Sequence, residues 1–188
     1  AVEAAEAILM ESNGTVVADP TRVKVITRSG PSLEQSKLIT GLALPKKRAH
    51  VEMPSSLGAG SILLVDGGLE LRSLSSDVQL SVTSTSVLQS FREAEEQRLL
   101  EQVNMLVDLG VTLLACREGI DDSMHSHLAN AGIKAFRRVA KSDLELLARG
   151  CGARLVPSIH QAKEADVGVF ISSRCEHWGD VDHWILET

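Results

Sequence analysis

The chain has 188 residues, of which 44% are hydrophobic and 23% charged, so it can form a sizeable core and is too apolar to be disordered. Its net charge of −6 and its aromatic content of 3% argue against a nucleic-acid partner, which would need a basic surface and stacking side chains. Its three cysteines have no Cys-x-x-Cys spacing and no stretch approaches about 18 uncharged apolar residues, so we expect a cytoplasmic protein with no membrane partner.

The N-terminal segment is expected to be a small, incomplete unit. Small and apolar residues at helical spacing predict a short amphipathic helix over residues 1–11, which the Asn-Gly pair at 13–14 ends. Alternation predicts a strand over residues 23–27. This segment is too small to bury its own core, so we place a boundary within residues 35–41. Because the sequence starts at Ala1 in what reads as mid-helix, we also expect a segment of a longer protein.

Buried strands and a long helix are expected next. Short apolar runs predict strands over residues 42–44, 62–65 and 78–82. The helix is expected over about 83–109, where Gly110 suits a C-terminal cap.

The two halves of this long helix differ in character. The second half has apolar residues spaced to form one core-facing stripe, namely Leu99, Val103, Leu106 and Val107. The first half has few apolar residues, Val87, Leu88 and Phe91, before a charged run at 92–98. We therefore expect the first half to project from the body of the domain.

A strand, a helix and a second strand follow, over residues 111–116, 120–131 and 133–139. This order favours a parallel pair with a right-handed crossover. A capping box at 142–145 is expected to open another helix that Gly150 ends, and closing strands are expected over 167–171 and 184–186. The elements together predict an α/β fold with a βαβ core, flanking β-strands and a long helical protrusion.

Motifs for catalysis or cofactor binding are missing from the sequence. No phosphate loop and no dinucleotide fingerprint occurs, and the Gly-Ala-Gly at 58–60 is interpreted as a hinge or a turn. His125 and His127 are two residues apart and so point to different faces of a helix, which leaves Asp121 with His125 as the pair able to clamp an ion. We interpret both histidines as exposed polar residues, and we expect no metal site and no catalytic residue.

Several stretches of the sequence carry a specific family pattern. Residues 116–122 read Cys-Arg-Glu-Gly-Ile-Asp-Asp, and residues 127–144 include Ala-Gly-Ile-Lys-Ala-Phe-Arg-Arg-Val. Together with Val-Lys-Val-Ile at 23–26, Leu-Ile-x-Gly at 38–41 and Gly-Ala-Arg at 152–154, they closely resemble the group II chaperonins. These are the archaeal thermosome and the eukaryotic cytosolic ring. The likeness covers nearly the whole chain in order.

The resemblance implies two domains. Residues 1–35 would be part of the intermediate domain and residues 36–188 the apical, substrate-binding domain, with the helix at about 83–109 as the protrusion that acts as a built-in lid. In this family, ATP and magnesium bind an equatorial domain whose phosphate loop is absent here. The full-length subunit is thus expected to be an ATPase, whereas this segment is not an enzyme and holds no cofactor. Non-native polypeptides and sister subunits of a double ring are the expected partners.

The resemblance also implies a client-binding surface on a loop and on the outward face of a helix. The expected substrate-binding residues are Leu69, Glu70, Leu71, Asp122, Ser126 and Asn130. On the protrusion, contacts with clients or with neighbouring protrusions are expected from Val87, Leu88 and Phe91. The alternative for Leu69 and Leu71 is strand core, and for the three helix residues it is a solvated stripe. The family typically has Gln-His-Tyr at 125–127 and lysine at the position of Glu118, so this chain departs from the family pattern near that surface.

Two other classes of function are the alternatives. A small α/β hydrolase or a nucleotide-dependent enzyme could use the βαβ unit, but the sequence lacks a phosphate loop and a nucleophile elbow. A chaperonin-like scaffold that joins a complex without cycling is the alternative within the family. An intact ATP loop and catalytic aspartate in the flanking sequence would favour the folding machine.

Overall fold

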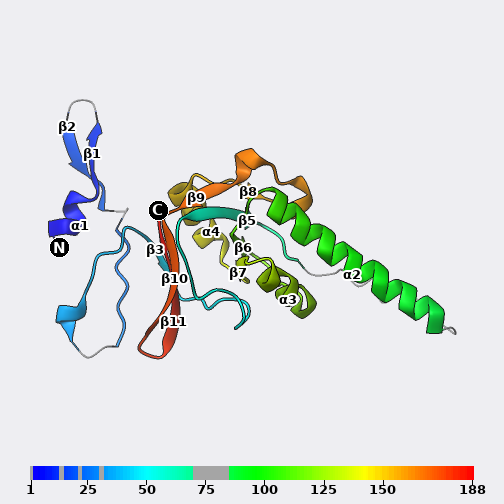
Figure 1. The fold of residues 1–188 in the computed structure, drawn as a ribbon. Coiled ribbons are helices and arrows are strands. Elements are labelled where there is room, and N and C mark those ends of the chain that lie inside the picture. Colours follow the sequence, from blue (N-terminus) through cyan, green and yellow to red (C-terminus); the bar gives the residue numbers. More distant parts are fainter. Residues whose placement is uncertain (1, 13–14, 21–22, 30–31, 70–84) are drawn as a thin grey trace.

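The fold is that of a computed structural model (Figure 1), in which the described residues are 2–12, 15–20, 23–29, 32–69 and 85–188. The strand expected at 78–82 lies outside the described residues, as do Glu70 and Leu71. In the part of the chain that the structure describes, no helix is long and apolar enough to span a membrane.

A mainly parallel sheet forms the centre of the fold. Its spatial order is β7 (Lys134–Phe136), β6 (Leu113–Cys116), β5 (Gly60–Val65) and β8 (Leu155–Val156), with β9 (Gly168–Phe170) antiparallel to β5. Because both faces of this sheet are covered, β5 and β6 are continuous apolar runs. The expected βαβ unit is confirmed: β6 and β7 are parallel, and α3 (Asp122–Asn130) lies between them in the chain.

Alternate residues of the sheet supply two separate cores. On one side, Leu63 and Val65 pack with residues of α2 (Thr85–Asp108) and α3, and we call this side the helical face. On the other side, Ile62 and Leu64 pack with α4 (Lys141–Cys151) and with a second sheet, and we call this the sheet-covered face. The second sheet is antiparallel, in the order β3 (Gly41–Leu44), β11 (Val181–Glu187), β10 (Ser172–Trp178) and β4 (Ser56–Leu57).

The long helix α2 confirms the expected division into two halves. Its second half buries Leu99, Val103 and Leu106 in the core of the helical face, whereas residues 92–98 are exposed. Figure 1 shows this first half extending past the sheets. Gly110, with a φ of +67, follows the helix as expected. The expectation that Val107 belongs to the core is wrong, because it lies at the edge of the stripe in the last turn and is 50% exposed.

The N-terminal segment differs from the expectation. The helix α1 spans only Val2–Glu6, and the residues expected to continue it form a hairpin of β1 (Leu9–Ser12) and β2 (Thr15–Ala18). An Asn-Gly pair between two short strands is a hairpin signal, and β-branched residues such as Val16 and Val17 favour strands. The strand expected at 23–27 is not formed, since this described stretch has no neighbouring strand for its hydrogen bonds.

Polar contacts join the N-terminal segment to the hairpin of β10 and β11. Arg28 Nε donates to His183 Nε2 at 3.0 Å. Lys37, which follows the 3-10 turn η2 (Leu33–Gln35) in the chain, donates from Nζ to Glu176 Oε2 at 2.7 Å. Burial raises the pKa of the Glu176 carboxyl, but hydrogen bonds from Arg174, Lys37 and Trp178 outweigh it and bring the pKa to about 2. None of the side chains described before Gly41 is buried, so the described residues of this segment add nothing to the buried core.

In the C-terminal part, the structure differs from the sequence-based expectations in several details. The helix α4 has Ala140 as its N-cap, so Ser142 lies inside the first turn and the expected capping box is not formed. The helix continues past Gly150 and is ended by Gly152, whose φ is +66. Two 3-10 turns, η3 (Ile159–Gln161) and η4 (Glu164–Asp166), lead from β8 to β9. The closing strands appear as β9 and β11, and β10 between them was not expected from the sequence.

Candidate functional site

The helix α3 carries three of the residues expected to bind substrate. Its inner side packs on the helical face through Met124 and Leu128. Its outer side presents residues four apart, which share one face of a helix, namely Asp122, Ser126 and Asn130. All three are exposed, and the Asp122 side chain is 94% exposed. We call these three residues the α3 stripe; their exposure agrees with a surface role, and their binding role stays a prediction.

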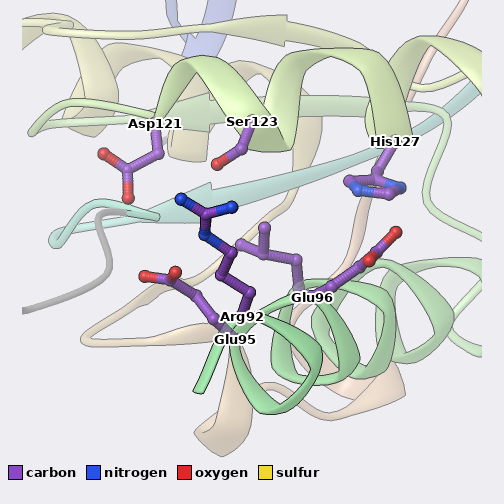
Figure 2. Close-up of a pocket in the computed structure, with 7 residues that line it drawn as sticks. Arg92, Glu95, Glu96, Asp121, Ser123 and His127 are labelled. Atoms are coloured by element: carbon purple, nitrogen blue, oxygen red, sulfur yellow. The ribbon is translucent and has the colours of Figure 1, made fainter. Parts of the chain in front are cut away.

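A groove of about 450 Å³ lies between α2 and α3, and its walls are formed by Arg92, Glu95, Glu96, Leu99, Asp121, Ser123 and His127. Figure 2 shows the charged side chains of α2 on one wall, facing Asp121, Ser123 and His127 on the other, with Arg92 directed across the groove. Leu99, which is 3% exposed, is the apolar residue of this lining, and the charged groups are three carboxylates and one guanidinium. We call it the α2–α3 groove.

Sequence reasoning missed the lining of this groove. A signal for it was available, because the charged run at 92–98 directly precedes Leu99, the first residue of the core-facing stripe on the same helix. Charged residues one turn outside a buried stripe form the rim of whatever the helix covers. What the sequence could not show is that α3 forms the opposite wall.

The loop after β5 gives a mixed result. Leu69 is 3% exposed and packs in the core of the helical face, so its side chain is core, which was the alternative weighed for it. Its backbone is fixed too, since its N–H donates to Gly119 O at 3.0 Å and its carbonyl accepts from Asp121 N–H at 3.1 Å. Glu70 and Leu71 lie outside the described residues.

The expected protrusion contacts are described only in part. The backbone of Val87, Leu88 and Phe91 lies within α2, as expected, while their side chains lie outside what the structure describes. Their role in contacting clients or neighbouring protrusions stays a prediction.

The two histidines of α3 differ from the expectation of exposed polar side chains. His127 is half-buried and lines the α2–α3 groove, whereas His125 is 3% exposed. Asp122 lies beside the ring, with its Oδ1 3.4 Å from His125 Nδ1 and 3.6 Å from Arg137 Nη1. The expectation for His125 is therefore wrong, because its ring turns inward beside Met124 and Leu128.

The glycines after β5 do not form a phosphate-binding loop. The two glycines after β5 come closest to a phosphate loop, but a Cβ at Gly67 would lie 2.8 Å from Pro157 O and one at Gly68 would lie 2.5 Å from Gly119 O. The space beside both glycines is thus taken by the chain's own carbonyl oxygens, which repel phosphate. Among the residues that the structure describes, no group of three or more His, Cys, Asp or Glu side chains is arranged to hold a metal ion.

Comparison with known proteins identifies relatives along almost the whole chain. Residues 1–187 match the TCP-1/cpn60 chaperonin family. The chain is 38% identical to thermosome subunit beta of Archaeoglobus fulgidus over 168 residues, which is 89% of this chain and 31% of that protein. It is 35% identical to the thermosome subunit of Methanopyrus kandleri over 167 residues, again 89% of this chain and 31% of the relative. The chain thus spans 31% of the length of these curated relatives.

The fold has a matching solved structure, described as the open state monomer of a group II chaperonin from Methanococcoides burtonii. The TM-score is 0.76 at 24% identity, over 99% of this chain and 40% of that chain. This likeness confirms the α/β fold class, and the thermosome relatives confirm the resemblance to group II chaperonins drawn from the sequence. By the extent of the family match and the identity to its relatives, this chain belongs to the TCP-1/cpn60 chaperonin family.

Proposed function

We propose that this chain is the part of a group II chaperonin subunit that binds non-native polypeptides. Residues 36–188 would be the apical domain, residues 1–35 a part of the intermediate domain, and the first half of α2 the built-in lid. In the whole subunit, ATP and magnesium would act at other domains, and sister subunits would assemble into a double ring in the cytoplasm. This segment would contribute no catalytic residue.

The observation that carries the proposal is the position of the α3 stripe beside the α2–α3 groove. Both lie on the outside of the helical face, where charged, polar and apolar groups are within reach of one polypeptide segment. An open surface of mixed character suits a binder of many unrelated sequences, because no single deep pocket selects one of them. Non-native chains expose apolar segments that such a surface can hold.

The shape of α2 supports the lid. Its 24 residues would extend about 36 Å at 1.5 Å per residue. Its second half is anchored in the core, and residues 92–98 before it are exposed. The exposed residues at 92–98 carry charges of both signs, which keeps a helix without a core contact compatible with water. A helix built in this way can reach past its own domain toward a client or a neighbouring subunit.

The test is capture of a chemically denatured model client by the chain, measured as binding affinity and as suppression of client aggregation. A triple alanine variant of the α3 stripe, D122A/S126A/N130A, should bind the client severalfold less tightly and melt within a few degrees of the parent chain, because these side chains are exposed. The matched control is K141A/E145A/R149A, which changes three exposed residues of α4. Equal losses in the stripe variant and this α4 variant would contradict the proposal, as would no binding by the parent chain.

A further inference from the structure

His125 is a buried polar side chain on the helix that carries the α3 stripe. It is 3% exposed, although Asp122 and Ser126 on the same helix are exposed. Its Nε2 is buried and has no hydrogen-bond partner among the residues that the structure describes. Buried polar atoms are almost always paired, so this orphan nitrogen marks a site that is under-satisfied in its present state.

The ring is held by elements far apart in the sequence. His50 stacks on it with ring centroids 5.8 Å apart and planes inclined by 25°. The segment of His50 is fixed to β7, because Ala49 N–H donates to Ala135 O at 2.8 Å. His125 is thus a point where α3 contacts the segment between β3 and β4.

The charged and titratable groups that face His125 come from three elements. Asp122, in the first turn of α3, lies 3.4 Å from Nδ1, and Asp121 precedes that turn. Arg137, just after β7, lies 3.6 Å from the same Asp122 oxygen and donates from Nη1 to Ile120 O at 3.4 Å. His50 completes the set from the segment after β3.

These surroundings suit a neutral imidazole and oppose a charged one. Protonation would add an N–H at Nε2, or at Nδ1 if Nε2 already carries the proton, and would place a positive charge near Arg137 on a ring that is 3% exposed. Burial lowers the pKa of His125, the positive charge of Arg137 and the presence of His50 lower it further, and Asp122 and Asp121 oppose the shift without reversing it. The exposed carboxylate of Asp122 is shared with Arg137 and so compensates only in part.

We infer that His125 is an acid-sensitive lock on α3: the neutral ring stays buried against His50, and the protonated ring leaves the site and loosens the first turns of the helix. The effect on client binding rests on the proposed function, because the α3 stripe lies on the same turns. The lock itself does not depend on that function.

The direction of the pH dependence follows from linkage. The pKa of His125 is lower in the folded chain than its ordinary value of 6.5, so the unfolded or loosened chain binds more protons as the pH falls below that value. Folding and docking of α3 therefore weaken on acidification. One linked proton can change the equilibrium by at most about tenfold per pH unit.

The lock is tested by urea unfolding of the 188-residue chain at pH 7.5 and pH 5.5, in the parent and in His125→Gln. Glutamine is neutral and polar and does not titrate, so the folding constant of the parent should fall by up to about tenfold more than that of the variant. His127→Gln, on the same helix but half-buried, should keep the pH dependence of the parent. Identical pH dependence of the parent and His125→Gln would overturn the inference.

A second measurement needs no variant. In proton NMR of the parent chain, the Cε1–H of His125 should titrate with a midpoint below 6.5, and α3 amide signals should shift at the same midpoint. A midpoint at or above 6.5 would overturn the inference even if His125→Gln failed to fold.

Client binding separates the lock from the proposed function. Between pH 7.5 and pH 5.5, affinity for a denatured client should fall more for the parent than for His125→Gln. Equal falls in both proteins would overturn the link between the lock and the α3 stripe. A parent chain that binds no client at pH 7.5 would contradict the proposed function, while the unfolding and NMR results would still decide the lock.

Discussion

The two faces of the parallel sheet are covered in different ways. On the sheet-covered face, the buried polar side chains have hydrogen-bond partners. Lys134 Nζ donates to Ser55 O at 2.9 Å and to both the carbonyl and the hydroxyl oxygen of Ser173 at 3.3 Å. Trp184 Nε1 donates to the same hydroxyl oxygen at 3.0 Å. On the helical face, α2 and α3 leave a groove between them, and His125 Nε2 is buried without a partner in the described part of the chain.

If the helical face binds clients as proposed, the two faces divide stability and binding between them. A face that only holds the structure together can be closed and can satisfy its polar groups, whereas a face that binds must keep side chains open to solvent and tolerate local looseness. We therefore expect substitutions on the sheet-covered face to change the free energy of unfolding. Substitutions on the outside of the helical face should change binding and leave unfolding nearly unaltered.

The largest effect is expected at Trp184, on the sheet-covered face. Its ring stacks on Phe136 with centroids 3.9 Å apart, and it is fully buried. Trp184→Ala should lower the free energy of unfolding by about 3–5 kcal/mol, measured by urea titration. Trp178→Ala, a half-buried tryptophan at the end of β10, is the matched control and should cost clearly less. Equal losses would mean that burial does not distinguish these sites.

A somewhat smaller effect is expected on the inner side of the helical face. Leu106 of α2 is fully buried, so Leu106→Ala should lower the free energy of unfolding by about 2–5 kcal/mol. The next residue provides the control, since the half-exposed Val107 should give about 0.5 kcal/mol or less in Val107→Ala. Urea titration of the two variants would show whether α2 has one anchored side. A large effect at Val107 would contradict the position assigned to it.

The buried lysine predicts a dependence on pH. Burial lowers the pKa of Lys134 from its ordinary value of 10.5, and neighbouring Cys175 opposes this in part. Just below 10.5 the unfolded chain then binds more protons, so stability should rise with pH in that window, by at most about 1.4 kcal/mol per pH unit. Lys134→Met should remove this rise, whereas Lys141→Met, at an exposed site in α4, should keep it. Urea unfolding curves of the parent and both variants at about pH 8, 9 and 10 measure this rise. A rise that persists in Lys134→Met would contradict the prediction.

The smallest effect on stability is expected at the projecting half of α2. If Val87, Leu88 and Phe91 lie beyond the body as proposed, the triple serine variant should change the free energy of unfolding by about 0.5 kcal/mol or less per site. The same variant should bind a denatured client less well, because exposed apolar side chains on a lid are available to clients. Thermal melting and client binding are measured on the same preparation. A triple variant that unfolds as readily as Leu106→Ala would show that this half of the helix is ordinary core.

Much of the fold could be predicted from the sequence where the signal is local. The apolar runs of β5 and β6 and the long periodic stripe of α2 predict their own structures, because burial on both faces or along one stripe leaves a clear pattern. The strand β10 lacks such a pattern, since Arg174 and Glu176 make it read as polar. It is a strand because β11 and β4 pair with it on both sides. Its hydrogen-bond partners, not its composition, decide its structure.

The candidate site could be predicted only on its outer side. Residues four apart share one face of a helix, and the three residues of the α3 stripe are polar. Their exposure could therefore be predicted from the sequence alone. The burial of His125 depends on His50, and that of Lys134 depends on Ser55 and Ser173, all from distant segments. A histidine or lysine read alone is assigned to the surface, where most of them lie.

The central claim is that clients contact the outside of the helical face. Site-specific photo-cross-linking tests it most directly, with a benzophenone amino acid placed at Ser126 on the α3 stripe or at Glu145 on α4, both exposed. A denatured client should cross-link to the probe at 126 and not to the probe at 145. Equal cross-linking at both positions, or cross-linking at 145 alone, would contradict the account.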